Sequence, residues 1–201
     1  MPELILLRHL QSQWNKENRF TGWTDVPLSK EGVESAKEIA EKLSGLKIDK
    51  IYTSPLVRNK ETVSLILKNL GEENLPIVID KALDERNYGK LQGLNKDGVK
   101  KQYGEEQVRL WRRSWTEAPP EGESLKDVYE RTTAFYKKYI EKDLKQGKNI
   151  LIVASHNSLR ALVKHIEKIS DDDIINLEIP FAGIRIYDFD KQLKIKNKKS
   201  F

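Results

Sequence analysis

The chain has 201 residues, contains no cysteine and carries a formal net charge of +5. This length suits one domain or two small ones, and the lack of cysteine excludes disulfide bonds and thiol catalysis and is compatible with a reducing cytoplasm. The N-terminus lacks the regions of a secretory signal, and no apolar stretch approaches the roughly 20 residues of a membrane span. We therefore expect a cytoplasmic protein with no membrane partner.

The positive charge is spread along the chain, except for a lysine-rich segment at residues 191–199. No aromatic side chains interleave with these lysines, so stacking on bases is not expected. We interpret the segment as a solvated end rather than an arm that binds nucleic acid. A net positive charge also suits small anionic substrates.

The first half of the chain predicts strands that alternate with helices. Strands are expected at residues 4–7, 50–53 and 77–79. A helix capped by Ser29 is expected to bury Val33, Ala36, Ile39, Ala40 and Leu43 and to stop at Gly45. A second helix opens at Pro55, where the missing N–H costs little, and ends at Gly71. Its buried face is expected to consist of Val63, Ile66, Leu67 and Leu70.

The second half begins with a polar, aromatic and irregular segment, residues 84–120, which we interpret as an insertion that covers a site. Ser124 is expected to cap a long helix that reaches about Leu144. Residues 150–154 are apolar without alternation, which predicts a central strand buried on both faces. A helix from Asn157 and a last strand at 184–187 follow. The pattern predicts a single α/β domain over residues 1–201, with three α/β/α layers and a mainly parallel sheet flanked by helices.

The first strand ends in Arg8 and His9, which suit phosphoryl chemistry. Neutral imidazole can attack phosphorus, and guanidinium can hold phosphoryl oxygens. Of the three histidines, His9 and His156 both follow apolar runs, so both are expected at one edge of the sheet. His165 falls inside a predicted helix and is interpreted as structural or exposed. By themselves, Arg8 and His9 also fit an ion-paired arginine and an ordinary polar histidine.

Further arginines could bind anions near these histidines. Arg58 is expected in the first turn of a helix, where free N–H groups and the helix dipole favour negative charge. The alternative for Arg58 is a surface arginine. Arg112 and Arg113, in the 84–120 segment, suit bidentate binding of carboxylate and phosphate, with a basic surface turn as the alternative.

Several motifs occur in order along the chain. They are Asn-Arg-Phe-Thr-Gly-Trp-Thr-Asp-Val-Pro-Leu-Ser at 18–29, Leu-Asp-Glu-Arg-Asn-Tyr-Gly-Lys-Leu-Gln-Gly-Leu-Asn-Lys at 83–96, Tyr-Gly at 103–104, Trp-Arg-Arg at 111–113 and Asn-Ser-Leu-Arg-Ala-Leu at 157–162. Over nearly its whole length, the chain therefore resembles the cofactor-dependent phosphoglycerate mutases of the histidine phosphatase superfamily. The resemblance implies a phosphoglycerate mutase-like fold.

It also implies an activity in glycolysis and gluconeogenesis, the interconversion of 3-phosphoglycerate and 2-phosphoglycerate. The implied intermediate is a phosphohistidine at His9, primed by 2,3-bisphosphoglycerate. No metal is expected, since no cluster has the usual ligand spacing. Related mutases are often dimers or tetramers, so a homodimer is one assembly that the resemblance implies.

The resemblance assigns roles to individual residues. The implied catalytic residues are His9, Glu85, His156, Arg8 and Arg58. The implied substrate-binding residues are Ser12, Asn15, Thr21, Gly22, Tyr88, Lys96, Arg112, Arg113 and Asn157. The sequence alone hardly separates Asp84 from Glu85, and either could form an ordinary ion pair with Arg86. For acid–base work, the pKa of the carboxyl group should be raised toward neutrality.

Two departures fall on the histidine motifs. Leu10 and Gln11 stand where the family has Gly-Glu, and Leu10 could crowd the phosphate or force a different turn. The second motif lacks one residue of the family's His-Gly-Asn-Ser. We prefer a deletion that keeps His156 in the catalytic place over an ungapped alignment that puts Ser155 there. Asn87 also stands at a position where the mutases commonly have histidine.

Two alternatives to an active mutase remain at this point. The first is a histidine phosphatase that acts on a small phosphate ester, against which Arg112, Arg113 and Tyr88 argue. The second is a catalytically impaired homologue that binds phosphorylated ligands. Leu10 and the shortened motif at His156 support it. The presence of Arg8, His9, Arg58 and Glu85 argues against it.

Overall fold

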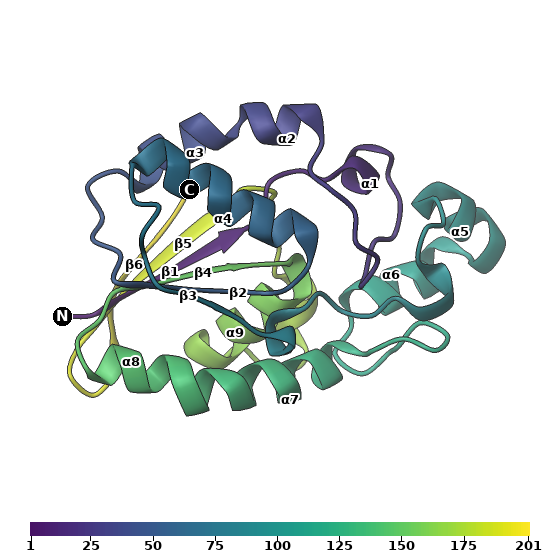
Figure 1. The fold of residues 1–201 in the computed structure, drawn as a ribbon. Helices are drawn as coiled ribbons and strands as arrows, with labels where there is room; N and C mark the ends of the chain where they lie inside the picture. Colours follow the sequence, from purple (N-terminus) through teal and green to yellow (C-terminus); the bar gives the residue numbers. More distant parts are fainter.

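The computed structural model describes residues 1–201, and its framework is one six-stranded sheet of order β3-β2-β4-β1-β5-β6 (Figure 1). The strands are β1 (Glu3–Arg8), β2 (Lys50–Thr53), β3 (Ile77–Ile79), β4 (Ile150–Ala154), β5 (Ile184–Phe189) and β6 (Ile195–Ser200). Strands β3, β2, β4 and β1 are parallel to one another. Strand β5 pairs antiparallel with β1, and β6 pairs antiparallel with β5. The expected mainly parallel sheet is confirmed, with β4 buried along its whole length.

Helices cover both faces of the sheet. They are α1 (Gln13–Lys16), α2 (Lys30–Glu34), α3 (Ala36–Leu43), α4 (Val57–Leu70), α5 (Lys96–Tyr103), α6 (Glu105–Arg113), α7 (Leu125–Phe135), α8 (Glu141–Lys145) and α9 (His156–Glu167). Figure 1 shows α2, α3 and α4 on one side of the sheet and α7, α8 and α9 on the other. The three layers expected from the alternation of strands and helices are therefore confirmed. None of the helices has the length and apolar composition that crossing a membrane requires.

Two apolar cores result from the alternation of side chains along the strands. In β1, Leu4 and Leu6 join the core beneath α7, α8 and α9, whereas Ile5 and Leu7 join the core beneath α3 and α4. A strand buried on both faces needs apolar residues at successive positions, which explains the unbroken run at its centre. This burial fixes β1 as the middle of the sheet.

The C-terminal segment differs from the expectation. It is not a solvated end but forms β6, which pairs antiparallel with β5, so residues 184–187 are not the last strand. Its lysine side chains lie in solvent while its backbone groups bond to the neighbouring strand. Charged side chains on an edge strand oppose further pairing, which is why the segment looks like a polar tail in the sequence.

Several element details also differ. Val33 is 45% exposed, because the helix breaks at Ser35 and the small Gly32 faces the backbone of Gln11 instead. Pro55 lies two residues before α4, which begins at Val57. A π-helical turn at Tyr136–Ile140 interrupts the long helix capped by Ser124.

The segment 84–120 lies at the end of the sheet toward which β1 points (Figure 1). It contains α5 and α6, which share a small separate core of Phe20, Leu91, Val99, Val108 and Trp111. The N-terminal loop with α1 lies next to it, and the backbone N–H of Phe20 donates to the Leu94 carbonyl at 3.0 Å. Two segments distant in sequence thus meet over the carboxyl ends of the strands.

Asp143 in α8 ties this helix to the sheet. Its carboxylate accepts hydrogen bonds from Lys50 Nζ (2.7 Å), Tyr52 Oη (2.6 Å) and Lys148 Nζ (2.7 Å). Burial opposes ionisation, but these donors hold the pKa of Asp143 well below its usual range. A depressed pKa stabilises the folded state above the unfolded pKa near 4, and this contribution is lost as the pH falls below it.

We therefore expect Asp143→Asn to lower the free energy of unfolding at pH 7 by about 1–3 kcal/mol. The difference from wild type should shrink as the pH falls from 4 toward 2. Urea unfolding at pH 7 and pH 3 measures both values, with the exposed Asp172→Asn as the control. An equal difference at the two pH values would contradict the ionic origin of the effect.

Candidate active site

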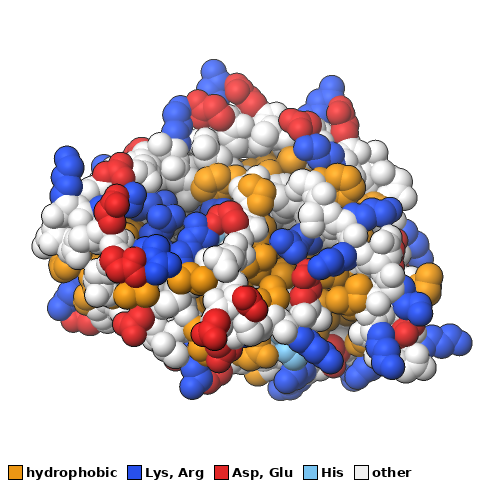
Figure 2. All heavy atoms as spheres, turned by 180° about the vertical axis from the view of Figure 1, so that it is seen from behind, with side chains coloured by type: hydrophobic (Ala, Val, Ile, Leu, Met, Phe, Trp, Pro, Cys, Tyr) orange, Lys and Arg blue, Asp and Glu red, His pale blue; other side chains and the backbone are white.

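A cavity of about 230 Å³ opens where β1 and β4 end. Its lining comprises Arg8, His9, Asn15, Asn18, Arg19, Phe20, Thr21, Gly22, Arg58, Glu85, Tyr88, Lys96, Arg112, His156, Glu178 and Phe181. Five of these side chains are lysine or arginine, and only Glu85 and Glu178 are carboxylates. Figure 2 shows a gathering of lysine and arginine side chains on its left, the half of the molecule that carries this end of the sheet. The cavity is suited to anions.

The structure brings most of the predicted site residues together in this lining. Three do not reach it: Ser12, Arg113 and Asn157. Ser12 is fully buried and caps α1, where its hydroxyl bonds to Asn15 Oδ1 at 2.8 Å, so it orients a residue of the lining. Asn157 and Arg113 contact other lining residues from behind, as described below.

His9 is held as a neutral imidazole. Its backbone N–H donates to the Ala154 carbonyl at 3.1 Å, which joins it to β4. Its Nδ1 lies 2.7 Å from the Leu10 carbonyl, and because a carbonyl only accepts, Nδ1 must carry the proton. Burial, Arg58 and Arg8 place the pKa of His9 well below its usual range. The lone pair on Nε2 is therefore free to act as a nucleophile.

The concern about Leu10 is not borne out by its position. Its side chain is fully buried in the core beneath α3 and α4 and does not line the cavity. Its backbone has no positive φ, so no glycine is needed for this turn. Its N–H donates to Thr62 Oγ1 at 3.1 Å. The chain accommodates leucine here because the side chain turns into the core.

The second histidine motif places His156, and not Ser155, in the cavity. The Ser155 hydroxyl is fully buried and accepts from Asn59 Nδ2 at 3.2 Å. His156 is the first residue of α9, which therefore begins one residue earlier than expected. Burial lowers the pKa of His156 to about 4. The geometry agrees with a one-residue deletion in this motif.

Arg58 and Arg8 are both buried in the cavity wall. Arg58 lies in the first turn of α4, and its guanidinium donates to the carbonyls of Gly22 (2.7 Å) and Thr24 (3.1 Å). Arg8 donates from Nη1 to the Ile179 carbonyl at 2.6 Å and lies 3.8 Å from the centre of the Phe181 ring. Burial lowers the pKa of Arg8 to about 10, so it stays charged at neutral pH. Both guanidiniums also fix the loops that shape the cavity.

Three buried polar atoms in the cavity wall make no hydrogen bond of good geometry: Arg8 Nε, Thr21 Oγ1 and His156 Nε2, of which only the last faces a carboxylate, that of Glu178 at 3.0 Å. Each can donate a proton, and buried donors without partners are rare in native proteins. An anionic oxygen in the cavity would satisfy them. The residues present therefore fit a phosphate or a carboxylate.

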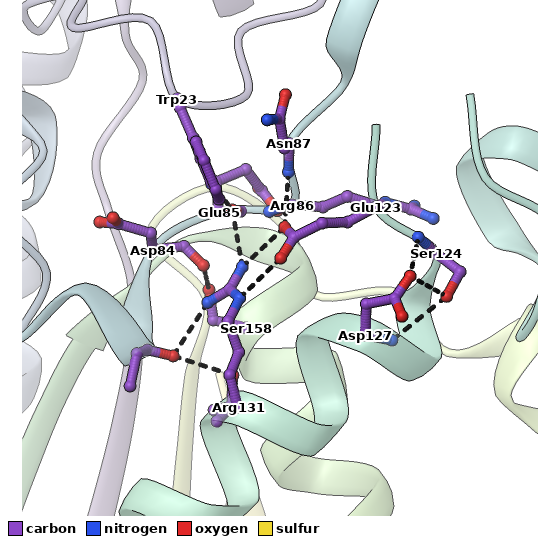
Figure 3. A network of polar contacts seen from close by, with 12 residues as sticks. Trp23, Asp84, Glu85, Arg86, Asn87, Glu123, Ser124, Asp127, Arg131 and Ser158 are labelled. Atoms are coloured by element: carbon purple, nitrogen blue, oxygen red, sulfur yellow. Dashed lines mark hydrogen bonds and ion pairs between the residues drawn. The ribbon is translucent and has the colours of Figure 1, made fainter. Parts of the chain in front are cut away.

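Glu85 is held from behind by a polar network (Figure 3). Its carbonyl oxygen accepts from Trp23 Nε1 at 2.6 Å and from Arg131 Nη2 at 2.9 Å. Its carboxylate accepts from the backbone N–H groups of Arg86 (2.7 Å) and Asn157 (3.1 Å). Both the backbone and the side chain of Glu85 are therefore fixed toward the histidines.

Asp84 and Glu85, which the sequence hardly separates, face different spaces. Glu85 lines the cavity, whereas Asp84 lines a separate cleft together with Trp23 and Arg131. Burial raises the pKa of Asp84 to about 6. Of these two carboxyl groups, only that of Glu85 faces the space where an anion would bind.

The pKa of Glu85 is lowered and not raised toward neutrality. Burial does act to raise it, but His156, the Arg86 backbone N–H and Arg58 outweigh burial and lower it. Glu85 is thus ionised at neutral pH. A dianion bound beside it would disfavour the charged carboxylate and raise its pKa.

Sequence reasoning missed the buried arginines behind the cavity. Arg86 and Arg160 are fully buried, and both share the Asn157 side-chain oxygen at 3.0 Å. Arg86 also donates to the Arg112 carbonyl at 2.6 Å, and Arg160 donates to the Arg113 carbonyl at 3.0 Å. Cations suit the carbonyls at a helix C-terminus, so this pair fixes the end of α6 and with it Arg112. Arg160 lies within the 157–162 motif, which is the one available signal.

Arg19, Glu178 and Phe181 were also missed. Arg19 lies within the 18–29 motif, but nothing in its spacing marks it as a cavity residue. Glu178 and Phe181 come from the segment before β5, where the sequence shows no motif at all. Their approach to Arg8 depends on how β5 pairs with β1.

Comparisons with known proteins agree on one family. Residues 4–197 match the model of the histidine phosphatase superfamily (branch 1). The chain is 46% identical to a 2,3-bisphosphoglycerate-dependent phosphoglycerate mutase of Cytophaga hutchinsonii, over 98% of this chain and 92% of that protein. It is 45% identical to a phosphoglycerate mutase of Schizosaccharomyces pombe, over 98% and 94%.

Solved structures share the fold. Bacillus stearothermophilus YhfR superposes with a TM-score of 0.83 at 26% identity, over 94% of this chain and 92% of that one. A protein described as mycobacterial hydrolase 1 has a TM-score of 0.85 at 23% identity, over 100% and 96%. At that identity, the second likeness concerns the fold alone.

Lys96 gives a pH test of the cavity. Burial, Arg112 and Arg8 lower its pKa to about 8. Lys96 is charged below this pH and loses its charge above it, so anions should bind more weakly as the pH rises through 8. We expect the Kd of sulfate, which stays a dianion, to rise several-fold between pH 7 and pH 9, as measured by calorimetry. Lys96→Gln should flatten this dependence, and an unchanged slope in the variant would contradict it.

Proposed function

The chain belongs to the histidine phosphatase superfamily and, within it, to the 2,3-bisphosphoglycerate-dependent phosphoglycerate mutases, and on this premise we propose that it interconverts 3-phosphoglycerate and 2-phosphoglycerate. The reaction belongs to glycolysis and gluconeogenesis. The observation that carries the proposal is the neutral His9, with Nε2 free, in a cavity lined by five lysine or arginine side chains. Such a site combines a nucleophile for phosphorus with cations for two anionic groups.

His9 is the proposed nucleophile. Its Nε2 forms the bond to phosphorus as the bond between phosphorus and the ester oxygen breaks, which yields a phosphohistidine. Arg8 and Arg58 hold the phosphoryl oxygens, and His156 donates from Nε2 to one of them. The Leu10 carbonyl keeps the proton on Nδ1 and stabilises the positive charge that develops on the ring.

Glu85 is the proposed proton shuttle. With a dianion bound, its raised pKa lets the carboxyl group give a proton to the ester oxygen that leaves phosphorus. The resulting carboxylate then takes the proton of the hydroxyl group that attacks the phosphohistidine. Because the network behind Glu85 fixes its backbone at Trp23 and Arg131, the carboxylate keeps its place between these two steps.

The remaining lining residues are proposed to hold the ligand. Arg112 and Lys96 bind the carboxylate of the phosphoglycerate, and Tyr88, Asn15, Thr21 and Gly22 supply neutral contacts. The primer 2,3-bisphosphoglycerate supplies the phosphoryl group that first loads His9. Since both hydroxyl positions must reach His9 in turn, the intermediate has to turn within the cavity. Ser12, Asn157 and Arg113 act through the lining residues that they contact.

The test is an assay coupled to enolase, with 3-phosphoglycerate as substrate, in the presence and absence of 2,3-bisphosphoglycerate. We expect turnover that depends on the primer and that falls below about one part in a thousand in His9→Ala, because the nucleophile is lost. His165→Gln is the matched control, since His165 lies in α9 outside the cavity and contacts Tyr129. Release of inorganic phosphate without enolase-coupled turnover would instead indicate a phosphatase, and well-folded protein that is inactive in both assays would indicate an impaired homologue.

We also propose that the protein forms a homodimer through β3. This strand is one of the two edges of the sheet, and it exposes Ile77 (43%) and Ile79 (52%). A groove lined by Val63 and Leu67 runs beside them. A second copy that pairs its own β3 antiparallel about a two-fold axis would cover both features on each subunit.

Ile79→Lys should therefore convert a dimer into a monomer, because it places two charges at the centre of the interface. Sedimentation velocity at tens of micromolar protein measures the change, with Ile79→Val as the control that keeps an apolar side chain. A monomeric wild-type protein under these conditions would rule out this dimer.

A further inference from the structure

Glu178 is a carboxylate that lies inside an anion site. It belongs to the segment before β5 and lines the cavity, and its side chain is half exposed. Its carboxylate lies 3.0 Å from His156 Nε2 and 3.9 Å from Arg8 Nη1, and it forms an ion pair with Arg113. These three side chains are the groups that would bind a phosphate or carboxylate of a ligand.

The charge of Glu178 is permanent under ordinary conditions. Burial acts to raise its pKa, but His156 and Arg113 lower it to about 2. The carboxylate therefore meets any incoming anion as a full negative charge. An anion that takes the donor of His156 must either replace Glu178 or stay beside a like charge.

The two carboxylates of the cavity differ in how they are held. Glu85 accepts two backbone N–H groups and is buried, so it stays in place. Glu178 contacts only side chains of the site, and half of its side chain faces solvent. The Glu178 carboxylate is therefore held less firmly than that of Glu85.

We propose that Glu178 is an internal competitor, whose carboxylate occupies part of the anion site in the free protein and leaves when an anionic ligand binds. The inference rests on the proposed function, in that it describes how the same site is regulated. Glu178 thereby weakens the binding of phosphorylated ligands and frees Arg113 and His156 only when a ligand has entered. It also neutralises part of the cluster of cations while the cavity is free.

Calorimetry with inorganic phosphate tests the proposal without any turnover. Removal of a like charge at this range should tighten binding, and we expect the Kd of phosphate to fall about tenfold in Glu178→Gln. Glu178→Asp keeps the charge and should retain weak binding. Glu38→Gln removes the same charge from a surface ion pair with Lys42 and should leave the Kd unchanged.

If Glu178 has only a structural role, removal of its charge should not tighten the binding of phosphate. If Glu178 only orients His156 and Arg113, Glu178→Gln will bind phosphate more weakly or equally well, and either outcome overturns the proposal. Glu178→Ala supplies the same comparison if the glutamine variant does not fold. Because phosphate binding needs no chemistry, this result stands even if the protein has no mutase activity.

Kinetics give a second, separate readout. In Glu178→Gln, the KM for 3-phosphoglycerate should fall by a similar factor while kcat does not rise. A fall in kcat with an unchanged or higher KM would indicate a positioning role for Glu178 and would contradict competition.

Discussion

The parallel pairing of β1 with β4 is the interaction on which the site depends. Arg8 lies opposite Ala154 in the register, so both strands end at the same level. The bond from the His9 N–H to the Ala154 carbonyl at 3.1 Å continues this pairing one residue beyond the strand. His156 follows two residues later and lines the same cavity. A one-residue slip of either strand would turn its side chains to the other face and separate the histidines.

The second constraint is the free-energy cost of burying several arginine side chains close together. Arg58, Arg86 and Arg160 are essentially fully buried, and desolvation lowers the pKa of Arg160 to about 9. The guanidiniums donate hydrogen bonds to carbonyl oxygens of neighbouring loops and of the end of α6, which partly offset this cost. Burial of the ring, together with the charges of Arg58 and Arg8, disfavours a charged imidazole. The arginines that attract anions therefore also help to keep His9 neutral and nucleophilic.

Packing accommodates the two local departures from the family pattern, one a substitution and the other a deletion. Leu10 adds an apolar side chain beside the nucleophile, and the core beneath α3 and α4 receives it. The shortened second motif starts α9 at His156 itself, so the imidazole still lies at the carboxyl end of β4. Glu178 is a different case, since a charge inside the cavity changes what the site can bind and not only how it folds.

Much of the fold and site was determined by the sequence alone. Buried strands and capped helices follow from short-range patterns of apolar residues, and the strand ends at Arg8 and Ala154 locate both histidines. The lysine-rich segment 191–199 was interpreted from the sequence as a solvated end, although residues 195–200 form β6. An edge strand pairs through backbone groups, which side-chain composition does not report. The sequence also left Arg86, Arg160 and Glu178 without a role. Their contacts join segments far apart in the chain, so only the tertiary structure decided them.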